Sequence, residues 1–81
     1  MNINIMNLNC FIENFADQFE ETDAGAFTPD TKFKELEEWN SLVALSVIAM
    51  VDEEYDITLK GDDIRSAITI NDLFVTIKEK M

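Results

Sequence analysis

Apolar residues recur every three or four positions at both ends of this chain, the spacing that places side chains on one face of an α-helix. The first series is Ile5, Leu8, Phe11, Ile12, Phe15 and Phe19, and the last is Ile70, Leu73, Phe74 and Ile77. Only two glycines and one proline interrupt the 81 residues, too few for the many turns of a β-fold. We therefore predict an all-α chain, and its length predicts a single domain spanning 1–81.

Capping residues predict where the later helices begin. A central helix is predicted from Ser41 to about Tyr55, because Asn40 can cap it with its side-chain oxygen. A short helix is expected near 62–66, and a last one from Thr69, where Asp72 three residues later completes a capping box.

A long connection over residues 20–40 separates the first helix from the central one. Thr28-Pro29 resembles a cap followed by a first-turn proline, so one helical turn is expected at Pro29–Phe33. The connection is too apolar for a free linker and is predicted to be an ordered crossover pinned by Phe27, Phe33, Leu36 and Trp39.

The charge is one-sided: 17 acidic and 6 basic residues give a net charge of −11. Phosphate polyanions and anionic membranes would be repelled, which leaves basic protein surfaces as complementary partners, or a charge that serves solubility alone. No basic residue precedes Lys32 and no apolar run approaches the ~18 residues of a membrane span. A cytoplasmic protein is expected.

Catalysis by this chain is not expected. It has no histidine and only one cysteine, Cys10, so the usual nucleophile–base pairs and an internal disulfide are absent. A carboxylate pair of the glycosidase type needs a cleft that so small a domain rarely builds. The acidic runs are too bunched for a calcium loop, and no metal site is predicted.

The central helix is apolar nearly all round. One broad arc is expected to face the core and comprises Ala44, Leu45, Val47, Ile48, Val51 and Tyr55, whereas Met50 points away from it. A second row, Leu42, Ser46, Ala49 and Glu53, runs along the outward face. Such a helix is either wholly buried or an interface. Asp52 and its acidic neighbours oppose the helix dipole, which favours a partner-facing role, although a solvated face is also compatible with them.

Ser41 lies in the first turn of that helix, where free N–H groups favour a phosphate. No base in the chain activates it, so any chemistry at Ser41 requires another protein. The alternative is an ordinary capping or solvent-facing serine.

The segment Glu38-Trp39-Asn40-Ser41-Leu42, the apolar helix and the acidic run Asp52-Glu53-Glu54 before Tyr55 resemble the acyl carrier protein family. The likeness extends over nearly the whole chain, including the short helix at 61–64 and the closing helix from Thr69. It implies a four-helix bundle of three longer helices and one short helix, with a long ordered loop between the first two.

The resemblance also implies a function, a cofactor and partners. Ser41 is the position that receives a 4′-phosphopantetheine arm, which carries acyl groups as thioesters in fatty-acid, polyketide or related biosynthesis. Asn40 is the cap that contacts the transferase, and Leu42, Ser46, Ala49, Asp52, Glu53 and Ile64 are the partner-binding positions. The implied partners of this monomer are a phosphopantetheinyl transferase, an acyl-loading ligase or acyltransferase, and ketosynthase-type or other acyl-processing enzymes with basic docking surfaces.

Two departures from the family pattern favour a stand-alone carrier of a specialised pathway. Asn40 stands where aspartate is usual, and Val43 and Ser46 replace positions that are often acidic. The alternative function is an unmodified adaptor or subunit that binds partners through the central helix. The two hypotheses differ at Ser41, because only the carrier requires its modification.

Overall fold

The computed structural model describes residues 7–81, and within that range the chain is a small helical bundle without strands. Its helices are α1 (Leu8–Ala16), α2 (Ser41–Tyr55), α3 (Gly61–Ser66) and α4 (Ile70–Lys80). Two 3₁₀ turns, η1 (Ala24–Ala26) and η2 (Phe33–Glu35), lie in the crossover between α1 and α2. The prediction of an all-α chain with three longer helices, one short helix and a long ordered connection is confirmed.

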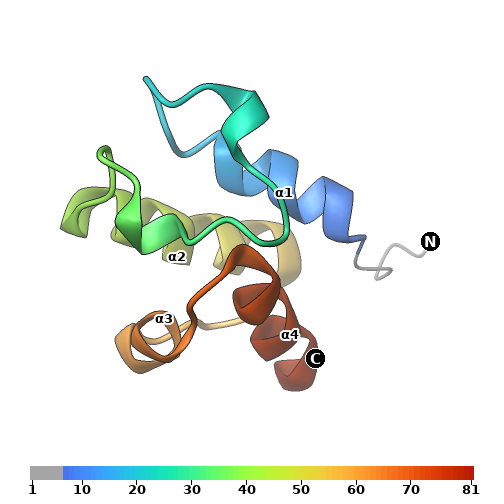
Figure 1. Ribbon diagram of the computed structural model, residues 1–81. Helices are drawn as coiled ribbons and strands as arrows, with labels where there is room; N and C mark the ends of the chain where they lie inside the picture. The colour runs from blue at the N-terminus through green and yellow to red at the C-terminus, as the bar shows by residue number, and fades with distance from the viewer. Residues whose placement is uncertain (1–6) are drawn as a thin grey trace.

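The bundle packs α1 against both α2 and α4, and α3 against α4. In Figure 1, α1 lies above α2, whereas α3 and α4 lie below it, and the crossover runs in front of α2 before turning back into Ser41. No helix within residues 7–81 is both long and apolar enough to cross a membrane.

The first helix begins at a cap that the apolar spacing did not identify. The Asn7 side-chain oxygen accepts hydrogen bonds from the backbone N–H groups of Asn9 at 2.8 Å and Cys10 at 3.3 Å. Phe11 and Phe15 of the predicted apolar face are fully buried, and Cys10 is exposed. Ile5, which the same spacing assigned to this face, lies outside the described residues.

The predicted caps of α2 and α4 are both confirmed. The Asn40 side-chain oxygen accepts from the Val43 N–H at 2.9 Å. At α4, the Asp72 N–H donates to the Thr69 hydroxyl and the Thr69 N–H donates to the Asp72 carboxylate, both at 3.1 Å. These bonds are local in sequence, so the residue types alone were sufficient to locate both helix starts.

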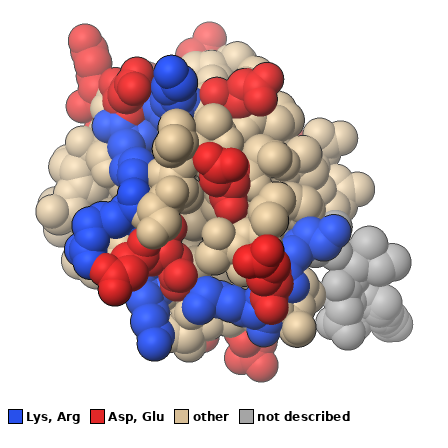
Figure 2. All heavy atoms as spheres, turned by 60° about the horizontal axis from the view of Figure 1, so that its bottom comes forward, with Lys and Arg blue, Asp and Glu red and all other residues tan. Residues whose placement is uncertain are grey.

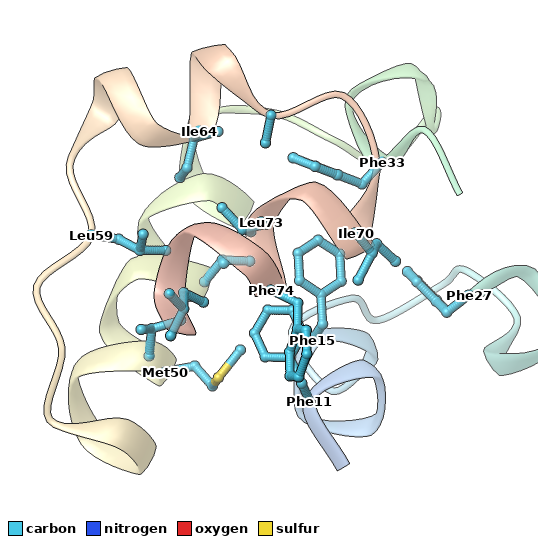
Figure 3. Close-up of a cluster of buried hydrophobic side chains, with 14 of the residues drawn as sticks. Phe11, Phe15, Phe27, Phe33, Met50, Leu59, Ile64, Ile70, Leu73 and Phe74 are labelled. Atoms are coloured by element: carbon cyan, nitrogen blue, oxygen red, sulfur yellow. The ribbon is translucent and has the colours of Figure 1, made fainter. Parts of the chain in front are cut away.

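The core is an aromatic cluster that joins the crossover to the helices. Figure 3 shows Phe11 and Phe15 of α1 pointing toward Phe74 of α4, with Phe33 and Phe27 of the crossover on the neighbouring side. The Phe15 ring lies 5.4 Å from the Phe33 ring, centroid to centroid, and 6.1 Å from that of Phe27. Each buried phenylalanine contributes roughly 1.5–3 kcal/mol of transfer free energy, so the crossover is part of the core.

The predicted helical turn at Pro29–Phe33 is wrong. Residues 28–31 form a single hydrogen-bonded turn, with the Thr31 N–H donating to the Thr28 carbonyl at 3.1 Å, and the helical turn η2 begins at Phe33. The carbonyls of Pro29 and Thr31 instead accept hydrogen bonds from the first amides of α4, at 3.0 and 3.1 Å. Those amides have no partner within their own helix, and the non-helical segment supplies their acceptors.

The predicted core face of α2 is wrong at two residues. Leu45 was expected inside but is 61% exposed, and Met50 was expected outside but is 6% exposed. Val47 and Val51 are fully buried as predicted. The buried face is therefore centred on Val47, Met50 and Val51, and it is narrower than the sequence pattern indicated.

Candidate functional site

Ser41 is an exposed residue in the first helical position of α2. Its neighbour Asn40 is extended and caps the helix through the Val43 N–H, and the Asn40 carbonyl accepts from the Ala44 N–H at 3.0 Å. The earlier N–H groups, those of Ser41 and Leu42, have no partner inside the helix because an α-helix leaves its first amides free. The positive end of a 15-residue helix therefore lies beside the Ser41 hydroxyl.

An open groove of about 600 Å³ begins beside Ser41. One wall is α2, through Ala44, Leu45 and Ile48, and the other is α3, through Gly61, Ile64 and Arg65. Trp39 and Lys34 of the crossover complete the lining. We call this space the α2–α3 groove; it is apolar between its walls and reaches about two turns along α2 from Ser41.

A second, smaller depression lies on the other flank of the α2 N-terminus. It holds about 240 Å³ and is lined by Gln18, Glu20, Glu38, Asn40, Leu42, Val43 and Ser46. Glu20 and Glu38 are its ionisable residues, whereas those of the α2–α3 groove are Lys34 and Arg65. The two sides of the α2 N-terminus thus carry opposite charges.

Glu38 connects the two ends of the crossover. Its carboxylate accepts hydrogen bonds from the N–H groups of Glu20 at 2.6 Å, Glu21 at 3.0 Å and Thr22 at 2.9 Å, and from the Thr22 hydroxyl at 2.7 Å. The Thr22 hydroxyl, followed by these backbone donors, lowers the pKa of Glu38 below its ordinary value, although partial burial acts in the opposite direction. Glu38 stands three residues before Ser41, so this contact fixes the backbone that leads into α2.

Trp39, between Glu38 and Asn40, is half-buried and packs on the crossover's aromatic residues. Its ring lies 5.0 Å from the Phe33 ring in an edge-on arrangement and 6.2 Å from the Phe19 ring in a stacked one. Trp39 therefore anchors the entry to α2 from the core side, while Glu38 anchors it from the surface side.

Most predicted partner-binding residues lie on the surface of α2. Leu42 is 74% exposed, and Ser46, Ala49, Asp52 and Glu53 are exposed as well. Leu42 and Ser46 also line the acidic depression, so this surface continues to the α2 N-terminus. The exposure of the outward row rules out the wholly buried central helix that the sequence left open.

Ile64 does not share that surface. It is 6% exposed and belongs to the core, where it lines the α2–α3 groove from the α3 side. The structure places Ile64 apart from the exposed row, because α3 turns its side chain inward, toward α2, rather than outward.

The net charge is distributed unevenly between the two halves of the chain. Residues 57–81 contain four basic and four acidic side chains, so the entire net charge of −11 resides in residues 1–56. Figure 2 shows the α3–α4 side of the molecule, where Lys and Arg side chains lie along the edges with carboxylates between them. A basic partner surface would therefore be attracted to the side formed by α1, the crossover and α2.

Comparisons with protein-family models, with curated proteins and with solved structures at the level of sequence and fold find no match for this chain.

Proposed function

We propose that this chain is an acyl carrier protein in which Ser41 is the attachment point of a 4′-phosphopantetheine arm. One observation carries the proposal: an exposed serine occupies the first turn of a capped helix and opens onto an apolar groove. The lack of histidine is compatible with a hydroxyl that a separate transferase must modify.

The residues around Ser41 fit such a group. The free amides and dipole at the start of α2 favour a phosphate on the Ser41 oxygen. The α2–α3 groove offers apolar side chains of Ala44, Ile48 and Ile64 to a chain extending from that phosphate. The arm, when attached, supplies a terminal thiol that carries acyl groups as thioesters.

The chain itself holds, orients and presents the arm. Asn40 keeps the first turn of α2 formed, and Glu38 and Trp39 hold the backbone leading into it. Leu42, Ala49 and Glu53 form an exposed row beside the arm, available to the transferase and to acyl-processing enzymes with basic docking surfaces. In this proposal the bundle is an acyl-carrier fold and the protein is a cytoplasmic monomer.

The test is covalent modification in vitro. The purified chain is incubated with coenzyme A, magnesium and a promiscuous phosphopantetheinyl transferase, and intact mass is measured. We expect the wild type to gain one arm, Ser41→Ala to gain none, and the matched control Ser46→Ala, on the same helix, to gain one. An unmodified wild type, under conditions that modify a known carrier domain, contradicts the proposal.

A second function, an unmodified adaptor, is favoured by the 74% exposure of Leu42 on a continuous surface of α2. An adaptor binds its partner equally well with Ser41→Ala and loses binding with Leu42→Asp. A carrier loses cargo transfer with Ser41→Ala. These two variants therefore separate the adaptor from the carrier.

A further inference from the structure

Two of the six basic residues of this acidic chain line the groove that opens beside Ser41. Lys34 comes from the crossover and Arg65 from the last turn of α3. The Lys34 ammonium donates to the Arg65 carbonyl at 2.8 Å, which holds the two residues together at one side of the groove. None of the residues lining this groove, within the described part of the chain, is acidic.

The ammonium of Lys34 contacts neutral groups, among them the Phe33 ring at 6.0 Å from its centroid. Its hydrogen-bond partner is a neutral carbonyl, and it forms no ion pair with the described residues 7–81. The Arg65 guanidinium pairs with Asp62 on the same helix, but both side chains are largely exposed, so that pair is weak and Arg65 can share a second anion. Cations thus remain available at the edge of the α2–α3 groove in a chain of net charge −11.

The groove is otherwise largely apolar. Ala44 and Ile48 from α2 and Ile64 from α3 line it, and a volume of about 600 Å³ exceeds what a phosphate alone would fill. A ligand that matches the whole groove has an apolar part and a negatively charged group.

We propose that the α2–α3 groove is a binding site for acyl groups that end in a carboxylate, with Lys34 and Arg65 as the anion-binding residues. The acyl carbons lie on Ala44, Ile48 and Ile64, and the carboxylate lies at Lys34 and Arg65. This inference deepens the proposed carrier function by naming its cargo class, and it depends on that function only for the biological source of the cargo.

The opposite flank of Ser41 provides the matched control. The acidic depression there is lined by Ser46, Glu20 and Glu38. A carboxylate placed in it faces like charges, which raise its pKa. A carboxylate in the α2–α3 groove faces Lys34 and Arg65, which lower it. The sign of the pKa shift thus distinguishes a cation site from the general field of an anionic protein.

The experiment attaches the probe chemically, so it needs no transferase. In a Cys10→Ser background, Ser41→Cys and Ser46→Cys are each alkylated with 6-(iodoacetamido)hexanoic acid carrying ¹³C at the carboxyl. The carboxyl pKa is then read by NMR titration against the free probe coupled to a small thiol. Lys34→Gln and Arg65→Gln are each combined with Ser41→Cys.

We expect a pKa lowered by about one unit at position 41 and raised at position 46. Lys34→Gln and Arg65→Gln should each bring the position-41 value back toward or above that of the free probe. A raised pKa at position 41, or one unaffected by both substitutions, overturns the inference. If the pKa at position 41 is lowered but the transferase never modifies the chain, the anion-binding site is supported and the carrier function alone is contradicted.

Discussion

Phe33→Ala tests whether the crossover is part of the core. The crossover leads directly into α2, so its packing fixes the position of Ser41. The Phe33 side chain is fully buried, and its ring contacts Phe15 of α1 at 5.4 Å and Trp39 at 5.0 Å. Removing a buried phenylalanine costs about 3–5 kcal/mol. A domain of 81 residues has a total free energy of unfolding of about 4–12 kcal/mol. We therefore expect Phe33→Ala to lose a large share of the stability.

The assay is urea unfolding followed both by far-ultraviolet circular dichroism and by fluorescence of Trp39, the single tryptophan. Because Trp39 reports on the crossover and circular dichroism on the helices, coincident transitions indicate one cooperative unit. Phe33→Leu, which keeps apolar bulk and loses two aromatic contacts, should cost about 1–3 kcal/mol and remains measurable if the alanine variant does not fold. Leu45→Ala is the control: its side chain is 61% exposed, so a change within about 0.5 kcal/mol is expected.

Two results would refute this reasoning. A Phe33→Ala loss below about 1 kcal/mol would mean that the crossover lies on the bundle without contributing to it. A Leu45→Ala loss as large as that of Phe33→Ala would mean that α2 is rotated, with Leu45 in the core.

Three further outcomes are expected. The pKa of Glu38 is lower in the folded chain than in the unfolded chain, so the ionised carboxylate stabilises the fold at pH values above its unfolded pKa. This contribution is lost as the pH falls through the folded pKa. In urea titrations, the stability difference between wild type and Glu38→Gln should therefore shrink below about pH 4.5. Asp56 ends α2 in the left-handed backbone region at φ 57°, which glycine adopts at lower cost, so Asp56→Gly should raise stability by roughly 0.5–1 kcal/mol and increase the Tm. An unchanged or lower Tm would contradict the left-handed conformation at the end of α2. Asn40→Asp keeps the cap and adds an anion beside Ser41, so it should speed modification by a broad transferase at low salt, an expectation that an equal or slower rate would discard.

Local signals were sufficient to predict most of the helical framework. The start of α2 followed from the Asn40 cap and the start of α4 from the Thr69–Asp72 pair, because capping bonds span only three residues. None of these features depends on the rest of the fold.

Contacts between distant residues were not predictable from the sequence. Glu38 bonds to amides 16 to 18 residues away, and nothing distinguishes it beforehand from the other glutamates of an acidic chain. The carbonyls of Pro29 and Thr31 accept hydrogen bonds from α4 amides that lie 42 and 39 residues further along the chain, so a proline that is typical of a helix start is instead an acceptor for a distant helix. Lys34 meets Arg65 in the same way, across 31 residues.

The rotation of α2 was ambiguous for a different reason. Its apolar residues extend so far round the helix that spacing alone does not choose between Leu45 and Met50 as core residues. The choice depends on the surrounding elements: Met50 faces the core in Figure 3, whereas Leu45 is left at the rim of the α2–α3 groove.

The site of modification is the most direct test of the proposed function. After incubation with coenzyme A and a transferase, trypsin releases residues 35–60 as one peptide that contains both Ser41 and Ser46. Tandem mass spectrometry of that peptide locates the added group. Fragment ions that place one phosphopantetheine on Ser41 are the predicted result, and a group on any other residue, or a peptide that stays unmodified, contradicts the account.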